Sequence, residues 1–220
     1  FNPQSPPDHA AFDAETSWTY ETGVKTAWLQ NRLVANAALF RTAWEDLQLD
    51  VPGSAPGLFY IDNAGSAHSQ GGELELTVTP LTGLDFFGGL GLLATEFDDG
   101  STSAGAPVGG NDLPFAPAMT WRAGTQYSRP LQRDLVAFLR VEGFGSSRYY
   151  YDAGNAAAQS DYFLVDTRLG CDAGPWRLEG WVGNAFDEDY VSVAFPFALA
   201  PSGYVGENGA PRTFGVSVRR

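Results

Sequence analysis

Along residues 166–169 and again along residues 177–182, charged or bulky polar groups occupy one set of alternate positions, and mostly apolar groups occupy the other. Successive side chains of an extended strand point to opposite faces, so a period of two indicates strands with one polar and one apolar face. The polar positions carry enough charge to line a watery interior, and the apolar positions of the chain carry Trp, Phe, Leu and Val, as in strands that meet lipid. The alternation predicts strands of a transmembrane β-barrel.

The composition excludes two other classes of protein. The most apolar run, residues 84–94, is interrupted by Asp85 and by glycines, and no run approaches the ~20 apolar residues of a membrane helix. The net charge of -13 argues against a nucleic-acid partner, which requires a basic surface. Aromatic residues make up 14% of the chain, and Tyr and Trp suit the interface between lipid and water.

The fold class that we expect is all-β, with about nine strands. They are predicted at 15–28, 33–51, 58–79, 84–97, 119–129, 135–150, 161–171, 176–193 and 212–220. Short turns follow the first, third, fifth and seventh strands, and long loops follow the others. Outer-membrane barrels sort their connections in this way, whereas the Greek-key crossings of a sandwich mix the lengths. The chain therefore reads as an antiparallel meander, part of a larger transmembrane barrel.

Five segments, in order, resemble the TonB-dependent outer-membrane receptors. Residues 15–25 resemble their E-x-S-x-x-Y-E-x-G-x-K segment, and residues 63–75 resemble N-A-G-x-A followed by G-x-E-x-E. The other three are L-P-x-x-P at 113–117, N-x-F-D-x-x-Y at 184–190, and the closing strand at 211–216. Each match alone is weak, and five in order make the resemblance specific.

The resemblance implies a place and a function for the chain. Residues 1–220 would be the C-terminal portion of a barrel of ~22 strands in the outer membrane of a Gram-negative bacterium, with the plug domain and the TonB box upstream. The family ends in an aromatic residue, whereas this chain ends in Arg220, so we expect a few further residues. The implied function is import of a scarce nutrient such as an iron–siderophore complex. The implied partners are outer-membrane lipid, a small-molecule ligand (a ferric siderophore) and, through the missing N-terminal region, the TonB complex.

The polar positions are the candidate site, because they would face the lumen. They are Glu21, Lys25, Glu73, Glu75, Asp85, Arg122, Arg140, Glu142, Asp166, Arg168, Arg177 and Glu179. If Ala173 and Gly174 form a two-residue turn, Arg168 faces Glu179 across the hairpin, which predicts a structural ion pair. Near one outer loop stand Tyr149, Tyr150, Tyr151 and Tyr162, as an interface girdle or, alternatively, as ligand-stacking aromatics.

The chain shows no catalytic constellation, no cofactor motif and no metal-ligand set, so we expect no enzyme. His9 and His68 are isolated in polar surroundings, which favours surface positions. Cys171 is the single cysteine and shares the apolar positions with Leu169, so it reads as a small apolar side chain. The acidic run 187–189 fits no calcium-loop spacing and reads as solvated surface.

Two alternatives to the importer remain open at this point. A soluble, extracellular β-sandwich that binds carbohydrate would use its exposed aromatics as sugar platforms. A passive porin would share the barrel but lack a plug. The arrangement of the strands in the structure distinguishes a two-layer sandwich from the wall of a barrel.

Overall fold

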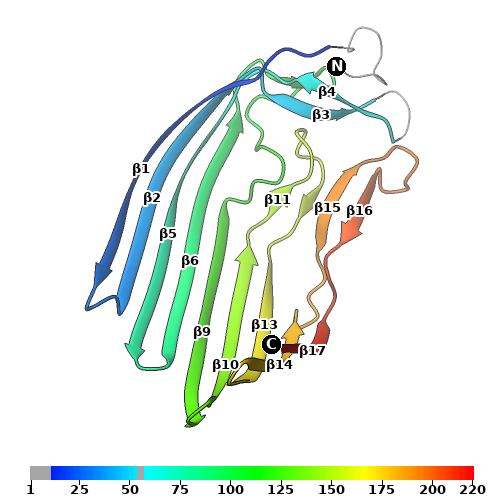
Figure 1. Ribbon diagram of the computed structural model, residues 1–220. Coiled ribbons are helices and arrows are strands. Elements are labelled where there is room, and N and C mark those ends of the chain that lie inside the picture. Colours follow the sequence, from blue (N-terminus) through cyan, green and yellow to red (C-terminus); the bar gives the residue numbers. More distant parts are fainter. Residues whose placement is uncertain (1–10, 54–56) are drawn as a thin grey trace.

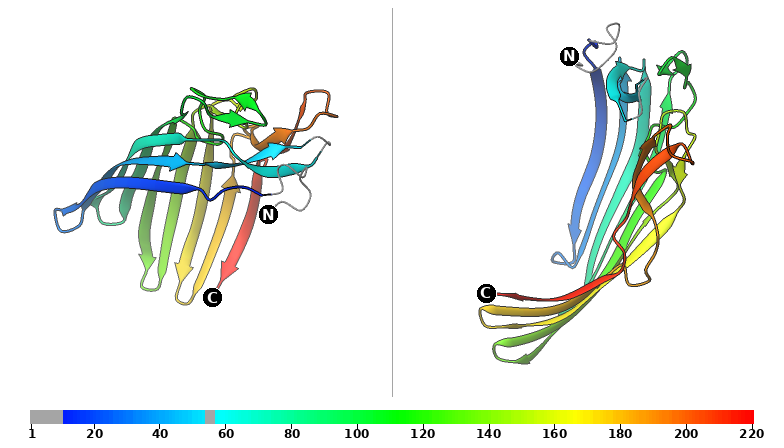
Figure 2. Two further views of the ribbon diagram at one scale, coloured as in Figure 1. Left: turned by 90° about the horizontal axis from the view of Figure 1, so that it is seen from above. Right: turned by 90° about the vertical axis from the view of Figure 1, so that its right-hand side faces the viewer.

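The computed structural model describes residues 11–53 and 57–220, and their main element is a single nine-stranded antiparallel sheet. Its strands follow the sequence, each pairing with the next in the sheet: β1 (Thr16–Trp28), β2 (Leu33–Glu45), β5 (Ala67–Leu81), β6 (Leu84–Phe97), β9 (Met119–Gln132), β10 (Leu135–Ser146), β13 (Tyr162–Ala173), β14 (Trp176–Gly183) and β17 (Thr213–Arg219). The sheet curves and twists as one layer (Figures 1 and 2). The nine-stranded meander is confirmed, and the two-layer sandwich is wrong.

The long loops carry four small hairpins of their own, gathered near one end of the sheet (Figure 1). They pair β3 (Gln48–Pro52) with β4 (Phe59–Asn63), β7 (Thr102–Ser103) with β8 (Ala106–Pro107), β11 (Tyr149–Tyr150) with β12 (Ala158–Gln159), and β15 (Val191–Pro196) with β16 (Tyr204–Asn208). No helix among the described residues is long and apolar enough to span a bilayer.

These hairpins correct four predicted strands. The strands expected at 33–51, 58–79, 135–150 and 176–193 each divide into a wall strand and a separate loop strand. The first breaks at Asp46, whose φ of 54° is left-handed, and the last breaks at Asn184, whose φ is 48°. Both residue types tolerate that conformation, which turns the chain out of the ladder.

The short turns fall where they were expected, but one register differs. Gly174 and Pro175 form the turn after β13, with Gly174 at φ 55°, so Ala173 pairs with Trp176. Glu179 therefore lies opposite Gly170, and Arg168 lies opposite Trp181. The predicted Arg168–Glu179 pair is wrong, because the observed register of the hairpin differs from the predicted one by two residues. A shift of two keeps every side chain on its face, so the alternation is unaffected.

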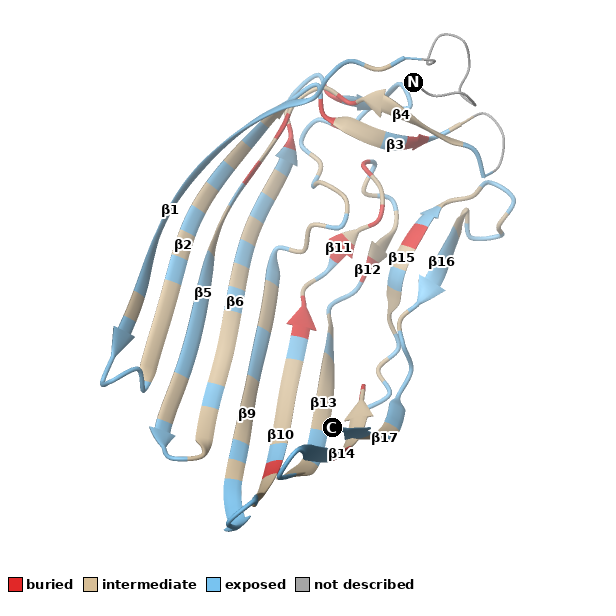
Figure 3. Cartoon of the chain, viewed as in Figure 1, coloured by how far each residue is buried: buried red, intermediate tan, exposed pale blue. Residues whose placement is uncertain are grey.

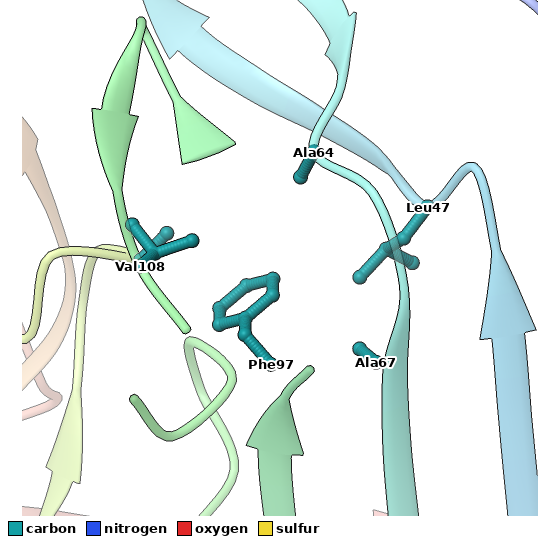
Figure 4. Close-up of a cluster of buried hydrophobic side chains, with 6 residues drawn as sticks. Leu47, Ala64, Ala67, Phe97 and Val108 are labelled. Carbon is teal, nitrogen blue, oxygen red and sulfur yellow. The ribbon is translucent and has the colours of Figure 1, made fainter. Parts of the chain in front are cut away.

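A wall of one layer has no interior core, and most of the buried residues gather where the strands meet the loops (Figure 3), with Phe138 and Glu179 as exceptions on the wall. Leu47, Ala64, Ala67, Phe97, Val108 and Ala153 form one cluster there, with Ala67 and Phe97 fully buried (Figure 4). These residues come from three different loops and the ends of two wall strands. The cluster therefore holds the loops to one another as well as to the sheet.

Aromatic rings lie over glycines on the neighbouring strand at four places on one face of the sheet. Each pair is directly opposed in the register: Phe40 with Gly71, Phe87 with Gly124, Phe138 with Gly170, and Trp181 with Gly215. A Cβ at Gly71, Gly170 or Gly215 would lie 2.7 Å from the ring, and one at Gly124 would overlap the Phe87 ring. The glycines leave room for the rings to approach the backbone of the neighbouring strand, and this fit favours the observed register.

This packing predicts that Gly124→Ala destabilises the wall by about 1–3 kcal/mol, because the added methyl group displaces the Phe87 ring. The control is Gly180→Ala, since a Cβ at Gly180 meets nothing closer than 4.0 Å. Guanidinium unfolding of the folded protein in detergent measures both. Equal midpoints for the two variants would show that the ring does not depend on the glycine.

Candidate functional site

The register places every sequence-predicted charged residue on one face of the sheet, here called the polar face. Glu75 is paired with Gly89 on β6, and Gly89 is paired with Arg122 on β9, so these three residues share a face. In the same way, Glu142 lies opposite Asp166. The register places the other predicted residues on the same face: Glu21, Lys25, Glu73, Asp85, Arg140, Arg168, Arg177 and Glu179. The opposite, apolar face exposes large side chains, among them Trp18, Leu39, Leu74, Leu169 and Phe214. Cys171 is half-buried on that face.

Two ion-pair groups occupy the middle of the polar face. Arg122 Nη2 lies 2.8 Å from Glu75 Oε1 across β6. Arg140 donates to both oxygens of Glu142 at 3.0 and 2.7 Å, and its guanidinium lies 4.4 Å from the centre of the Phe87 ring. Such a forked, stacked arginine has little freedom left. The charged side chains at the centre of the polar face are therefore paired with one another.

A further group lies toward β17. Arg177 donates to both oxygens of Asp172 at 2.6 and 2.9 Å. Glu179 is buried, its side chain only 6% exposed, and Arg219 Nη2 lies 3.2 Å from its Oε1. The sequence prediction missed Asp172 and Arg219, although both occupy polar positions of the alternation. Glu21, Lys25 and Glu73 form no ion pair within the described residues.

The loop tyrosines lie inside the loop cluster or at its edge. Tyr149 and Tyr151 are each 8% exposed and meet edge to face at 5.6 Å. The Tyr151 hydroxyl lies 2.9 Å from the Val191 carbonyl oxygen and 3.1 Å from Gln159 Oε1. Tyr150 lies under the Arg148 guanidinium at 4.7 Å. Tyr149 and Tyr151 therefore join loops. A role in ligand stacking or at the membrane interface stays a prediction for the four tyrosines, including Tyr162.

Tyr162 stacks on Tyr190 of the last loop, with ring centres 4.6 Å apart and planes 9° from parallel. The Tyr204 hydroxyl donates to Asp152 Oδ2 at 3.0 Å, from the last loop to the loop before it. Burial and this hydrogen bond raise the pKa of Tyr204 to about 12, so its hydroxyl stays a donor at physiological pH. Further links are Asn111 Nδ2 to the Ala153 carbonyl at 2.8 Å and the Phe59–Phe195 ring pair at 5.6 Å. The described loops form one connected body.

Asn184 fastens the last loop to the wall. Its backbone N–H donates to Asp166 Oδ1 at 2.9 Å on the polar face. Its side-chain amide donates to the Glu188 and Ala210 carbonyls at 2.9 and 3.1 Å, and its Oδ1 accepts from the Glu188 N–H at 2.8 Å. Asn184 is 6% exposed, so these bonds are shielded from water. The N-x-F-D-x-x-Y motif thus fixes the start of a loop.

The remaining candidates carry no visible chemistry. His68 Nδ1 lies 2.8 Å from Asp98 Oδ1, and His9 lies outside the described residues. Asp187 in the acidic run accepts from the Arg212 N–H at 2.8 Å, which engages that carboxylate within the loop. Within residues 11–53 and 57–220 no three His, Cys, Asp or Glu side chains gather as a metal site.

Residues 2–185 match the family described as TonB dependent receptor-like, beta-barrel. The chain belongs to the TonB-dependent receptor β-barrel family. This family is found in the outer membrane of Gram-negative bacteria. The resemblance seen in the five sequence motifs is confirmed, and the matching family is that of the TonB-dependent receptors.

Several relatives show how much of a receptor the chain represents. It is 27% identical over 206 residues to the catecholate siderophore receptor Fiu of Escherichia coli K12, covering 92% of this chain and 25% of Fiu. It is 29% identical over 217 residues to the pesticin receptor of Yersinia enterocolitica, covering 96% of this chain and 30% of the receptor. The crystal structure of the ferric yersiniabactin uptake receptor FyuA from Yersinia pestis superposes with a TM-score of 0.79 at 25% identity, over 94% of this chain and 30% of FyuA. The chain thus spans between a quarter and a third of these relatives.

The hydrogen bonds of Asn184 predict that Asn184→Ala loosens the last loop selectively, by about 1–3 kcal/mol of local stability. Hydrogen exchange should rise over residues 185–212 and stay unchanged in β5 and β6. Asn208→Ala is the control, because Asn208 lies in the same loop and its side chain makes no hydrogen bond in the described part of the chain. Exchange that rises equally in both variants would contradict the role of Asn184.

Proposed function

We propose that this chain is the C-terminal portion of the barrel of an outer-membrane TonB-dependent receptor that imports an iron–siderophore complex. The observation that carries the proposal is the membership of the family, together with relatives that are themselves named as siderophore receptors. Import is a transport function and requires no catalytic residue in this part of the receptor.

The two faces of the sheet support this assignment. In the proposed barrel the apolar face meets lipid, and the polar face lines the lumen, where Glu75, Arg122, Arg140 and Glu142 remain hydrated. All backbone groups of a membrane wall must be paired, and the nine-strand ladder pairs those of its inner strands. The linked loops then lie at the outer surface, where a ligand arrives, and the short turns lie on the periplasmic side.

The remaining parts of the machine lie in the rest of the receptor. The plug would fill the lumen against the polar face, and the TonB complex would supply the energy that moves it. The ligand is bound at the outer face before that movement, so the outer loops of this chain contribute part of the binding surface.

The test uses the full-length receptor in a Gram-negative strain that lacks its own siderophore receptors. Under iron limitation, a ferric catecholate should support growth and uptake of radioactive iron only when the receptor and TonB are both present. Uptake that persists without TonB would contradict energised import. A receptor that stays monomeric and dissolved without detergent would contradict the membrane location.

The apolar face yields a prediction about charge placement. Leu169→Arg on that face should destabilise the barrel by about 2–4 kcal/mol if it lies near the bilayer midplane, because its charge would lie in hydrocarbon. Asp166→Asn on the polar face keeps the Oδ1 acceptor for Asn184 and should cost far less. Refolding titrations into lipid vesicles measure both. Equal tolerance at the two positions would mean that the faces are assigned the wrong way round.

A further inference from the structure

A hollow of about 480 Å³ lies on the apolar face, across β1, β2, β5 and β6, and is lined mostly by apolar side chains. The register explains why the face is hollow there. Two rows of directly opposed residues cross it, and each row places a small residue between two large ones. The rows are Leu39, Gly72 and Leu92, and Val24, Ala37 and Leu74. The small residues therefore leave a depression between exposed apolar side chains.

Arg41 lies at the loop end of this hollow. The nine wall strands carry all but two of their Lys and Arg residues on the polar face, and the exceptions are Arg41 on β2 and Arg129 on β9. Arg41 follows Leu39 by two residues on the same face, toward the loops, whereas Arg129 lies close to the short turn after β9. One cation of the apolar face thus adjoins the hollow.

The guanidinium of Arg41 has donors to spare. Its side chain is exposed, and Nη1 donates to Gln70 Oε1 at 3.1 Å. Among residues 11–53 and 57–220 it donates no other hydrogen bond and has no carboxylate within ion-pair distance. The acidic side chains of this face, Glu45 and Glu96, lie nearer the loops. A guanidinium has five N–H donors in a fork that matches the oxygen atoms of a phosphate.

Exposed aromatic side chains indicate the depth of Arg41 in the membrane. On the apolar face of β1, Trp28 lies at the turn end, and Tyr20 and Trp18 lie toward the loops. Tyr20 precedes Trp28 by eight residues, which is ~27 Å along an antiparallel strand. Aromatic girdles flank the apolar band of an outer-membrane barrel, which is about 25 Å tall. Arg41 is directly opposite Tyr20, so it lies at the level of the lipid headgroups, with the hollow beside the acyl chains.

We propose that Arg41 and the hollow bind one phosphorylated acyl lipid of the outer leaflet, with a phosphate on the guanidinium and an acyl chain in the hollow. Charge complementarity selects this occupant, because a cation at headgroup level favours an anionic headgroup above the hydrocarbon that an apolar hollow accepts. The loop end faces the outside of the cell, so the lipid is the phosphorylated glycolipid of that leaflet, lipid A. The site rests on the proposed function only for this orientation.

The experiment titrates the full-length receptor, washed free of lipid in detergent, with diphosphorylated lipid A, and counts the bound lipid by native mass spectrometry. One lipid should bind saturably. Arg41→Gln should weaken binding about tenfold or more, which is the loss expected for a charge-assisted hydrogen bond. Lipid A without its phosphates should bind the unaltered receptor and Arg41→Gln equally weakly.

A second variant tests the hollow separately. Ala37→Leu fills the hollow from an exposed position of the wall, so it should weaken the binding of both forms of lipid A. The controls are Arg129→Gln and Ala137→Leu, the same changes at two directly opposed residues near the other end of the apolar face. Both should bind lipid A as the unaltered receptor does. Arg41→Lys keeps the charge without the fork and should retain part of the affinity, which covers the case in which Arg41→Gln does not fold.

The site is overturned if the unaltered receptor binds no lipid A saturably, if Arg41→Gln binds it normally, or if the controls lose as much affinity. Phosphatidylglycerol that binds as tightly as lipid A would overturn the assignment to the outer-leaflet glycolipid. Lipid-free receptor dimers that dissociate in Ala37→Leu would assign the hollow to a second copy instead. Failed siderophore uptake with lipid A binding intact would count against the proposed function alone, and normal uptake without lipid A binding would overturn the site alone.

Discussion

The structure depends on the hydrogen-bonded register of neighbouring strands, because the wall is one layer thick. In a two-layer protein a strand is also held by the sheet or helix packed on it. Here β6 is held by β5 and β9, and the alternation then assigns each side chain to one of two surroundings. A slip of one residue would exchange Leu169 and Arg168 between the faces. The rings of Phe87 and Trp181 on their glycines oppose such a slip, since each ring fits only opposite a residue without a Cβ.

The loops supply the enclosed packing that the wall lacks. Phe97 and Ala67 are buried where two wall strands end, and Tyr149 and Tyr151 are buried between the last two loops. Burial of this kind removes apolar area from water and so holds the loops at the outer end of the sheet. Displacement of one described loop is therefore resisted by its contacts with the others.

Much of the wall could be predicted from the sequence, because alternation reports the face of each residue directly. Glu75, Arg122 and Arg140 were assigned to one face without knowledge of any register. The end of a wall strand leaves no comparable signal. Residues 33–45 and 48–52 both read as extended, and only Asp46 and Leu47 separate them. The hairpin pairing of Arg168 depended on whether the turn began at Ala173 or Gly174. Contacts between loops, such as Tyr204 with Asp152, join residues distant in the chain and could not be predicted from spacing.

Asn184 connects the last loop to the wall. Its side chain belongs to the last loop, whereas its N–H is bonded to Asp166, which lies opposite Glu142 on the polar face. Glu142 in turn holds Arg140, which rests on Phe87. The last loop is therefore joined to the charged wall through the Asp166 carboxylate, in addition to the stack of Tyr190 on Tyr162. In the proposed receptor this series of polar contacts joins the last loop to the lumen face.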